Sequence, residues 1–295
     1  MTQFPTAHTL RIRNRRRFLL TAATLPLMAA APARAAGLAP LRFGTTPVFL
    51  NDQIALLGIW KSYLEQRLHR PVAFVQRGSY REIVDLLRSE TLDIAWLCGF
   101  PFVLYPQRIS LVAVPRYQGK PLYQSYLIVP QSDSETSHVS QLSGRVFAYS
   151  DPLSNSGYLV PRAELIRAGH RPDQFFRRTF FTFGHRKVVQ AVQAGLANAG
   201  AVDGYVWDTL VRQQPIETRG LRIAWRSPYF GFPPVVARSS LAKDERDAVT
   251  RALLGMRASE RGSQLLGKLN IEDFTHASPA LFDGIRELVR SVERD

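Results

Sequence analysis

The sequence contains a single cysteine, Cys98, among its 295 residues. An intrachain disulfide is therefore impossible, and the chain is not a small scaffold held together by cystines. A Gly-x-Ser-x-Gly elbow is also missing, which disfavours a hydrolase that would use Ser154 or Ser156 with His185 and Asp203. We therefore predict that the protein is not an enzyme, and we expect no cofactor and no metal.

Acidic residues are scarce, because 24 Asp and Glu stand against 38 Lys and Arg and the net charge is +14. A balance this basic suggests a nucleic-acid or membrane partner. Residues 1–35, however, hold six Arg and no acid, so the rest of the chain carries +8. That remainder shows no basic stripe with interleaved aromatic residues. We predict no nucleic-acid partner, and the remaining charge suits a protein that meets anions.

Residues 1–35 have the three parts of an export signal. Five Arg lie between residues 11 and 17, an apolar stretch covers 19–31, and Ala33 and Ala35 have the spacing that a signal peptidase needs. The apolar stretch is too short to anchor the chain in a bilayer. Cleavage before residue 36 would release the mature protein into the periplasm.

The basic part of this signal leaves the export route open. In "NRRRFLL" (14–20), Arg15 and Arg16 followed by Phe18 and Leu19 resemble a twin-arginine signal. An ordinary secretory signal with a strongly basic start is the alternative. Both routes predict export from a bacterial cytoplasm.

Apolar periodicity in the mature chain predicts two α/β units. "LRFGTTP", "PVAFVQR" and "LDIAWLCG" are predicted strands, separated by predicted helices over 51–68 and 80–87. "GRVFAYS" begins a second unit, with predicted helices over 158–168, 185–197 and 205–212. Strands that alternate with helices indicate mostly parallel sheets flanked by helices.

Two such units joined by extended crossings predict a hinged two-lobe protein with the type II periplasmic-binding-protein fold. We expect the first lobe to comprise residues 36–125 and 233–295, and the second 126–232. C-terminal helices over about 240–257 and 281–293 would complete the first lobe.

Three polar segments follow predicted strands of the second unit. They are Ser154, Asn155, Ser156 and Gly157 in "DPLSNSGYLVPR", then His185, then Asp203. Ligands of parallel α/β sheets lie beyond the carboxyl ends of strands. A helix N-terminus, hydroxyl groups and a histidine ring can donate to an oxyanion, and glycine allows close approach. Asp203 can accept from a protonated ligand oxygen, which favours a protonated oxyacid.

Each segment also has an ordinary structural explanation. Ser and Asn before a helix are common N-caps, and Asp-Pro commonly opens a turn. His185 can equally be a capping or core residue, and Asp203 can cap the next helix. The prediction of a site rests on all three segments meeting at one edge.

The sequence resembles the periplasmic phosphonate, phosphite and phosphate-type substrate-binding proteins of ABC importers. The resemblance is carried by "DPLSNSGYLVPR", "FTFGHRKVVQAV" and "AGAVDGYVWDTL", in that order. It implies that Ser154, Asn155, Ser156 and His185 hold ligand oxygens and that Asp203 accepts from the ligand. Asn155 stands where the family usually has Thr.

Two further departures concern the first lobe. The family usually offers Tyr hydroxyls to the ligand, and the counterparts here are Phe49 and Phe102. The hydroxyls are lost unless Tyr105, Tyr117 or Tyr123 replaces them.

These features predict a protein that captures a small oxyanion, a phosphonate, phosphite or phosphate-like species, for a membrane ABC permease. The alternative is a periplasmic arsenite or oxyanion sensor that signals to a membrane histidine kinase. Cys98 decides between them, because a thiolate suits trivalent arsenic and does not suit a phosphonate. A buried, inert Cys98 is the ordinary expectation for a cysteine at the end of an apolar strand.

Overall fold

The computed structural model describes residues 39–46 and 54–293. The chain divides into the segment Met1–Gly37 and a compact unit, Leu38–Asp295. The predicted export signal therefore lies outside the described residues, as does Phe49. No described helix is long and apolar enough to cross a membrane.

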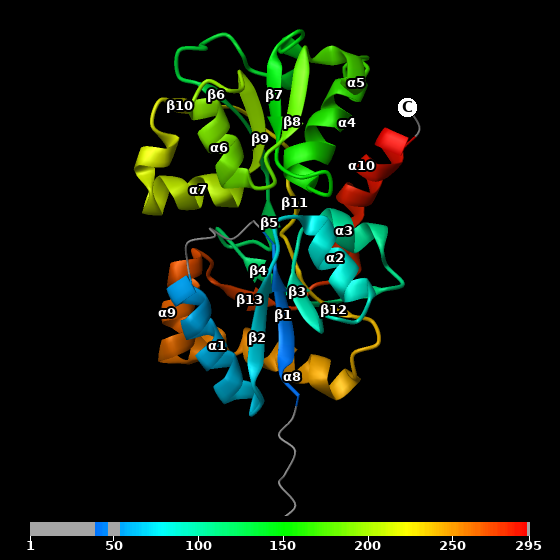
Figure 1. The fold of residues 1–295 in the computed structure, drawn as a ribbon, viewed down its shortest axis with the longest axis vertical. Coiled ribbons are helices and arrows are strands. Elements are labelled where there is room, and N and C mark those ends of the chain that lie inside the picture. Colours follow the sequence, from blue (N-terminus) through cyan, green and yellow to red (C-terminus); the bar gives the residue numbers. More distant parts are fainter. Residues whose placement is uncertain (1–38, 47–53, 294–295) are drawn as a thin grey trace, which may run out of the picture. The chain divides into compact units, whose positions relative to one another are not determined.

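The compact unit is built on two separate sheets with helices packed on them (Figure 1). The first lobe has a six-stranded sheet, whose spatial order is β13 (Asp273–Thr275), β4 (Ile109–Arg116), β12 (Val235–Arg238), β3 (Ile94–Trp96), β1 (Leu41–Thr45) and β2 (Val72–Gln76). The helices from these chain segments are α1 (Ile54–Leu68), α2 (Tyr80–Arg88), α3 (Gly99–Leu104), α8 (Lys243–Leu254), α9 (Glu260–Leu269) and α10 (Asp283–Glu293).

The second lobe has a five-stranded sheet. Its spatial order is β10 (Leu221–Arg226), β6 (Ser125–Pro130), β9 (Ala199–Asp203), β7 (Val146–Tyr149) and β8 (Arg178–Phe181). Its helical segments are a π-helical turn (Asn155–Leu159), α4 (Val160–Arg167), α5 (Pro172–Phe175), α6 (His185–Gln193) and α7 (Gly204–Gln213). Short 3-10 turns cover Val139–Gln141, Pro215–Thr218, Met256–Ala258 and Pro279–Phe282.

Two extended segments join the lobes and form a hinge. They are the short antiparallel strands β5 (Leu122–Tyr123) and β11 (Phe230–Gly231), which lie between the two sheets (Figure 1). The C-terminal helix α10 packs against α3 and also against α4 of the second lobe. The predicted two-lobe fold is confirmed, while the lobe boundaries stay a prediction.

Both sheets are mixed, although the sequence suggested mostly parallel ones. In the first lobe β1 pairs parallel with β2 and β3, and β12 then pairs antiparallel with β3 and β4. In the second lobe β7 pairs parallel with β8 and β9, and β6 pairs antiparallel with β9. The antiparallel strands adjoin or follow the hinge, so the crossing of the chain between lobes sets their direction.

Helices carry their apolar residues on the face that meets a sheet. In α2, Tyr80, Ile83, Val84 and Leu87 are buried and Ser79 caps the first turn by accepting from Glu82 N–H. In α6, His185, Val188, Val189 and Val192 have the same spacing and are also buried. A residue that begins either helix is thereby turned towards the interior.

Some elements differ from the sequence prediction. The helix predicted over 51–68 is described from residue 54, and the segments of α3 and α9 were not predicted as helices. Helix α3, "GFPFVL", is short, almost wholly apolar and contains a proline, so it shows no amphipathic period. This helix forms where its residues, Gly99 to Phe102 among them, are buried in the folded chain, and no local pattern predicts it.

Candidate functional site

The carboxyl ends of strands in both lobes bring polar residues into one buried cluster. From the second lobe come the turn after β7 with residues 154–157, His185 after β8, and Asp203 at the end of β9. Tyr80 and Cys98 follow β2 and β3 of the first lobe. Each of these side chains is at most 3% exposed. The sequence-predicted segments of the second lobe meet at His185, which borders Gly157 and accepts from the Asp203 N–H.

The turn after β7 presents backbone N–H groups to this cluster. Ser154 caps it, since its Oγ accepts from Gly157 N–H at 3.0 Å. The Asn155 N–H points across the lobe boundary and donates to Cys98 Sγ at 3.2 Å. Ser154 thus has its ordinary capping role, while the next residue of the turn faces the other lobe.

Gly157 is required by close packing at this point. A Cβ there would lie 1.9 Å from Ser150 Oγ and 3.1 Å from His185 Cε1. The backbone of the turn therefore approaches the histidine ring as only glycine allows. This approach joins two of the predicted segments physically.

Several polar atoms in the turn are buried without a hydrogen-bond partner in the described part of the chain. They are Ser150 Oγ, Asn155 Oδ1 and Ser156 Oγ. Buried polar groups in proteins are nearly always paired, so each exception calls for an explanation, such as a bound ligand or water. A ligand with oxygen and hydroxyl groups would satisfy them.

His185 is held in one tautomer by the backbone. Its Nδ1 accepts from the Asp203 N–H at 3.0 Å, so the proton of the neutral ring is on Nε2, which lies 3.2 Å from Tyr80 Oη. Burial lowers the pKa of His185 to about 3. The ring is therefore a neutral donor.

Asp203 combines a capping role with its place in the cluster. Its Oδ1 accepts from Tyr205 N–H at 2.9 Å and caps α7. Burial raises its pKa to about 8, although backbone N–H groups oppose the rise. The carboxyl group is consequently protonated at neutral pH and can donate a hydrogen bond.

Two tyrosines place their hydroxyls in this cluster, Tyr123, which the sequence left open, and Tyr80, which it did not identify. Tyr123, on the hinge strand β5, accepts from Asn155 Nδ2 at 3.0 Å, and Tyr80 reaches His185. Tyr117 instead donates to Asp208, and Tyr105 lies under the Arg88 guanidinium. Tyr80 begins α2, with three residues between it and the end of β2, and this position at the carboxyl end of a strand is the signal that could have identified it.

Of the two phenylalanines expected beside the ligand, the structure describes only Phe102. Phe102 is buried and its ring packs edge-on against Phe282, with centroids 4.9 Å apart, in the core of the first lobe. Its role beside a ligand stays a prediction. Phe49 lies outside the described residues.

Cys98 faces the polar cluster as the cap residue of α3 and is 3% exposed. Burial raises the pKa of its thiol to about 12, with the Asp203 and Asp151 carboxyls adding to the rise. At neutral pH it is a neutral thiol, so a reactive thiolate is not available.

Asp151 connects the two lobes beside this cluster. Its Oδ2 accepts from Tyr80 N–H, the first N–H of α2, at 3.0 Å, and its Oδ1 accepts from Leu153 N–H at 2.8 Å. Burial raises the pKa of Asp151, while both N–H groups oppose the rise. Tyr80 therefore makes two contacts with the second lobe, one from its backbone and one from its hydroxyl.

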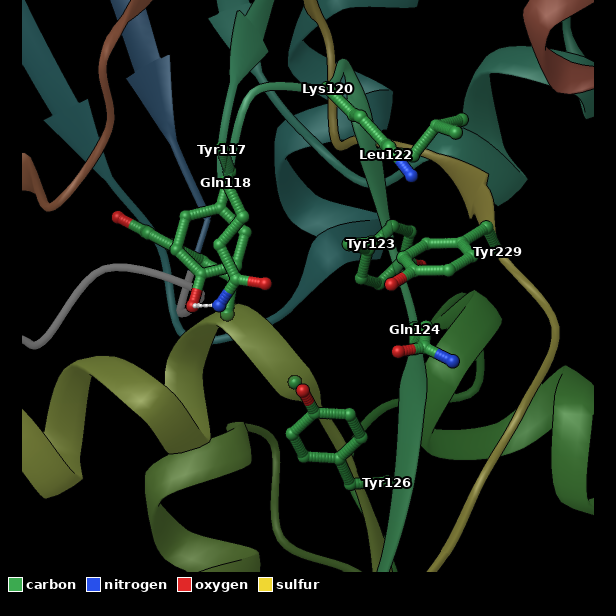
Figure 2. Close-up of a pocket in the computed structure, with 10 residues that line it drawn as sticks. Tyr117, Gln118, Lys120, Leu122, Tyr123, Gln124, Tyr126 and Tyr229 are labelled. Carbon is green, nitrogen blue, oxygen red and sulfur yellow. Dashed lines mark hydrogen bonds between the residues drawn. The ribbon is translucent and has the colours of Figure 1, made fainter.

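A separate small pocket of about 40 Å³ lies at the hinge (Figure 2). Tyr117, Tyr126 and Tyr229 line it together with Tyr123, whose hydroxyl reaches Asn155. Its volume suits a few water molecules. Among the described residues, no group of three or more His, Cys, Asp or Glu is placed to hold a metal ion.

Two lobes joined by a hinge, with a polar cluster buried between them, define a solute-binding protein. The family model for "ABC transporter, phosphonate, periplasmic substrate-binding protein" matches residues 43–282. The chain belongs to this family, whose members are periplasmic binding proteins of transporters and not enzymes. The suspected family is thereby confirmed.

Individual relatives are distant in sequence and close in fold. The probable ABC transporter phosphite-binding protein PhnD1 of Prochlorococcus marinus is 23% identical over 278 residues, covering 85% of this chain and 93% of the relative. The solved structure of PhnD1 with methylphosphonate has a TM-score of 0.76 at 21% identity, covering 86% and 98%. A binding protein of an ABC phosphonate transporter from Pseudomonas aeruginosa reaches 0.79 at 22% identity, covering 86% and 87%.

Proposed function

We propose that this protein is exported to the periplasm, binds a small tetrahedral oxyanion between its lobes and delivers it to a membrane ABC permease. The ligand is a phosphonate, phosphite or phosphate-like species. The observation that carries the proposal is the convergence of neutral donors from both lobes in one buried cluster. The methylphosphonate complex of PhnD1, a protein with the same fold, supports the ligand class.

The donors have distinct positions around the proposed oxyanion. The turn after β7 offers the Asn155 N–H and the Ser156 hydroxyl, and His185 of α6 offers its Nε2–H, which lies 3.2 Å from Tyr80 Oη. The hydroxyls of Tyr80 and Tyr123 would approach from the first lobe and the hinge. Closing of the lobes would complete the donor set, so ligand binding and closure are coupled.

Calorimetric titration of the purified, reduced protein with phosphite, methylphosphonate and phosphate tests the proposal. We expect binding of at least one of them, with affinity reduced at least about tenfold in His185→Ala and in Asp203→Ala, as for loss of one hydrogen bond to a charged group. Unchanged affinity in both variants would remove these residues from the site. Absence of binding by every phosphorus oxyanion would refute the function.

A second function, an arsenite sensor coupled to a membrane histidine kinase, is favoured by the position of Cys98. Its Sγ takes a hydrogen bond from the Asn155 N–H, within the proposed donor set. A thiol and an As–OH group condense to As–S and release water, with the thiol proton leaving in that water. Trivalent arsenic prefers such a sulfur ligand.

Repeating the titrations with arsenite on Cys98→Ser separates the two functions. Binding of a phosphorus oxyanion that survives Cys98→Ser supports the importer. Binding of arsenite alone, lost in Cys98→Ser, would replace it with the sensor.

A further inference from the structure

The proposed site is made of neutral and acidic groups. His185 is fixed as a neutral ring because its Nδ1 accepts the Asp203 N–H at 3.0 Å. Cys98 is a neutral thiol, and the Tyr80 and Tyr123 hydroxyls are likewise uncharged, since burial raises the pKa of all three groups. The donors thus offer dipoles to an anion and no formal positive charge.

The titratable groups that act on Asp203, or on which it acts, come from elements of both lobes. They are His185 of α6, Tyr80 of α2, Cys98 at the start of α3, Tyr123 of β5, and Tyr205 and Asp208 of α7. Strand β6 meets Asp203 through Ser125, which does not titrate, and Asp151 acts together with Asp203 on Tyr80 and Cys98. None of these groups is a Lys or an Arg. Arg81, on the exposed face of α2, lowers the pKa of Asp151.

We propose that this cluster selects singly charged oxyanions, so that a phosphonate or phosphite binds as its protonated monoanion while doubly charged sulfate is rejected. The inference rests on the proposed function and specifies the charge of its ligand. The cost of burying an ion rises with the square of its charge, and the described groups of this cluster include no cation to offset that cost. For a doubly charged ligand of the same shape, the free energy of desolvation therefore exceeds the free energy gained from hydrogen bonds to these neutral donors.

Asp203 contributes to this selection through its own proton. With its Oδ1 engaged by Tyr205 N–H, the protonated carboxyl adds a donor and no charge. On ionisation it becomes an acceptor with a negative charge beside the ligand. Binding of a phosphonate or phosphite should consequently require both the ligand proton and the Asp203 proton, whereas a sulfonate, already a monoanion, should require only the Asp203 proton.

The test is calorimetric titration from about pH 6 to about pH 9 with three anions of similar tetrahedral shape. Methylphosphonate should lose about tenfold in affinity per pH unit above its second ionisation, and more steeply where Asp203 also ionises. Methanesulfonate, singly charged throughout, should lose affinity only through Asp203. Sulfate should not bind at any pH. Equal affinity for methylphosphonate across the range, or sulfate bound as tightly as methylphosphonate, would overturn the proposal.

Two variants test whether the proton that the protein must hold for binding is the one on the Asp203 carboxyl group. Asp203→Asn is neutral at every pH, so methanesulfonate affinity should become independent of pH. Asp247→Asn, which alters a carboxylate paired with Lys243 on α8, should keep the wild-type profile. A pH-dependent methanesulfonate affinity that persists in Asp203→Asn would overturn the role of Asp203. Should Asp203→Asn fail to fold, as judged by thermal melting, the pH profiles of the three anions on the wild-type protein still decide whether the site selects singly charged ligands.

These outcomes are distinct from failure of the proposed function. Binding that is independent of pH refutes charge selection and leaves an oxyanion-binding protein. The absence of methylphosphonate, phosphite and phosphate binding at every pH refutes the function and the charge selection together.

Discussion

Replacement of Asp151 by Asn tests whether this carboxylate holds the lobes together. The aspartate accepts from Tyr80 N–H in the other lobe and from Leu153 N–H in its own turn. Asparagine offers one oxygen and one NH₂ group, so one of the two N–H donors would face another donor. The Leu153 contact is local, two residues along the chain, whereas Tyr80 lies 71 residues away. We expect the turn to keep the oxygen and the contact between lobes to be lost.

The size of the effect follows from the kind of contact. A hydrogen bond to a charged group contributes about 1.5–3 kcal/mol. The carboxylate also lies at the N-terminus of α2, where the helix dipole favours negative charge. With about 1.4 kcal/mol per factor of ten, the closed form should lose roughly 10- to 100-fold relative to the open form. Apparent ligand affinity falls by up to the same factor, because the binding-competent form is less populated.

Titration with methylphosphonate and small-angle X-ray scattering give the two readouts. Asp151→Asn should weaken binding and increase the radius of gyration, while thermal melting changes little because the core of each lobe is intact. Asp133→Asn is the matched control, since Asp133 accepts from Thr136 N–H and Oγ–H within the second lobe. The reasoning is refuted if Asp151→Asn binds as tightly as wild type or is equally compact.

Three further predictions concern the cluster. Tyr80→Phe should weaken ligand binding about tenfold, as measured by titration, because the proposed donor set loses the hydroxyl that lies 3.2 Å from His185 Nε2. An unchanged affinity would place Tyr80 outside the site. Gly157→Ala should abolish binding and lower the free energy of unfolding in urea by about 1–3 kcal/mol, because its Cβ would lie 1.9 Å from the Ser150 hydroxyl. Gly58→Ala is the control: with open space around it, the substitution should stabilise α1 by about 0.5–1 kcal/mol. Equal effects of the two variants would contradict the packing argument. Burial raises the pKa of Asp203 from 3.8 to about 8, so the stability that it contributes is fully present below pH 3.8 and is lost as pH rises from 3.8 to about 8. Burial lowers the pKa of His185 from 6.5 to about 3, so the folded state is destabilised as pH falls from 6.5 towards 3. In urea unfolding, His185→Gln keeps only the Asp203 effect, so its free energy of unfolding should fall as pH rises towards 8. Asp203→Asn keeps only the His185 effect, so its free energy of unfolding should fall as pH drops below 6.5. Each slope should reach up to about 1.4 kcal/mol per pH unit, and parallel profiles of the two variants would refute both assignments.

Much of the site followed from local sequence patterns. Residues 154–157, His185 and Asp203 were predicted to meet because each follows a strand, and parallel strands end at one edge of a sheet. The pairing of β7 with β8 and with β9 is indeed parallel. The capping roles of Ser154 and Asp203 were also predicted and are present in the structure. The same two residues belong to the proposed ligand site, so the two roles are compatible.

Other features depended on contacts between distant parts of the chain. Tyr80 meets His185 across 105 residues, and Asn155 meets Cys98 across 57. No local period or cap encodes such contacts, so the sequence left Tyr80 unassigned and the direction of Cys98 open. The mixed sheets have the same origin, because the hinge decides in which direction β12 and β6 enter.

The sequence by itself determined the family, the order of most strands and helices (α3 and α9 excepted) and the polar segments at strand ends, because these depend on residue type and short-range spacing. Only the tertiary structure decided the chemistry of the cluster. The tautomer of His185 depends on the Asp203 N–H, and the protonated state of Asp203 depends on complete burial. The first is set by a backbone hydrogen bond between residues 18 positions apart, and the second arises because the folded chain excludes water from a carboxyl group that water would otherwise keep ionised.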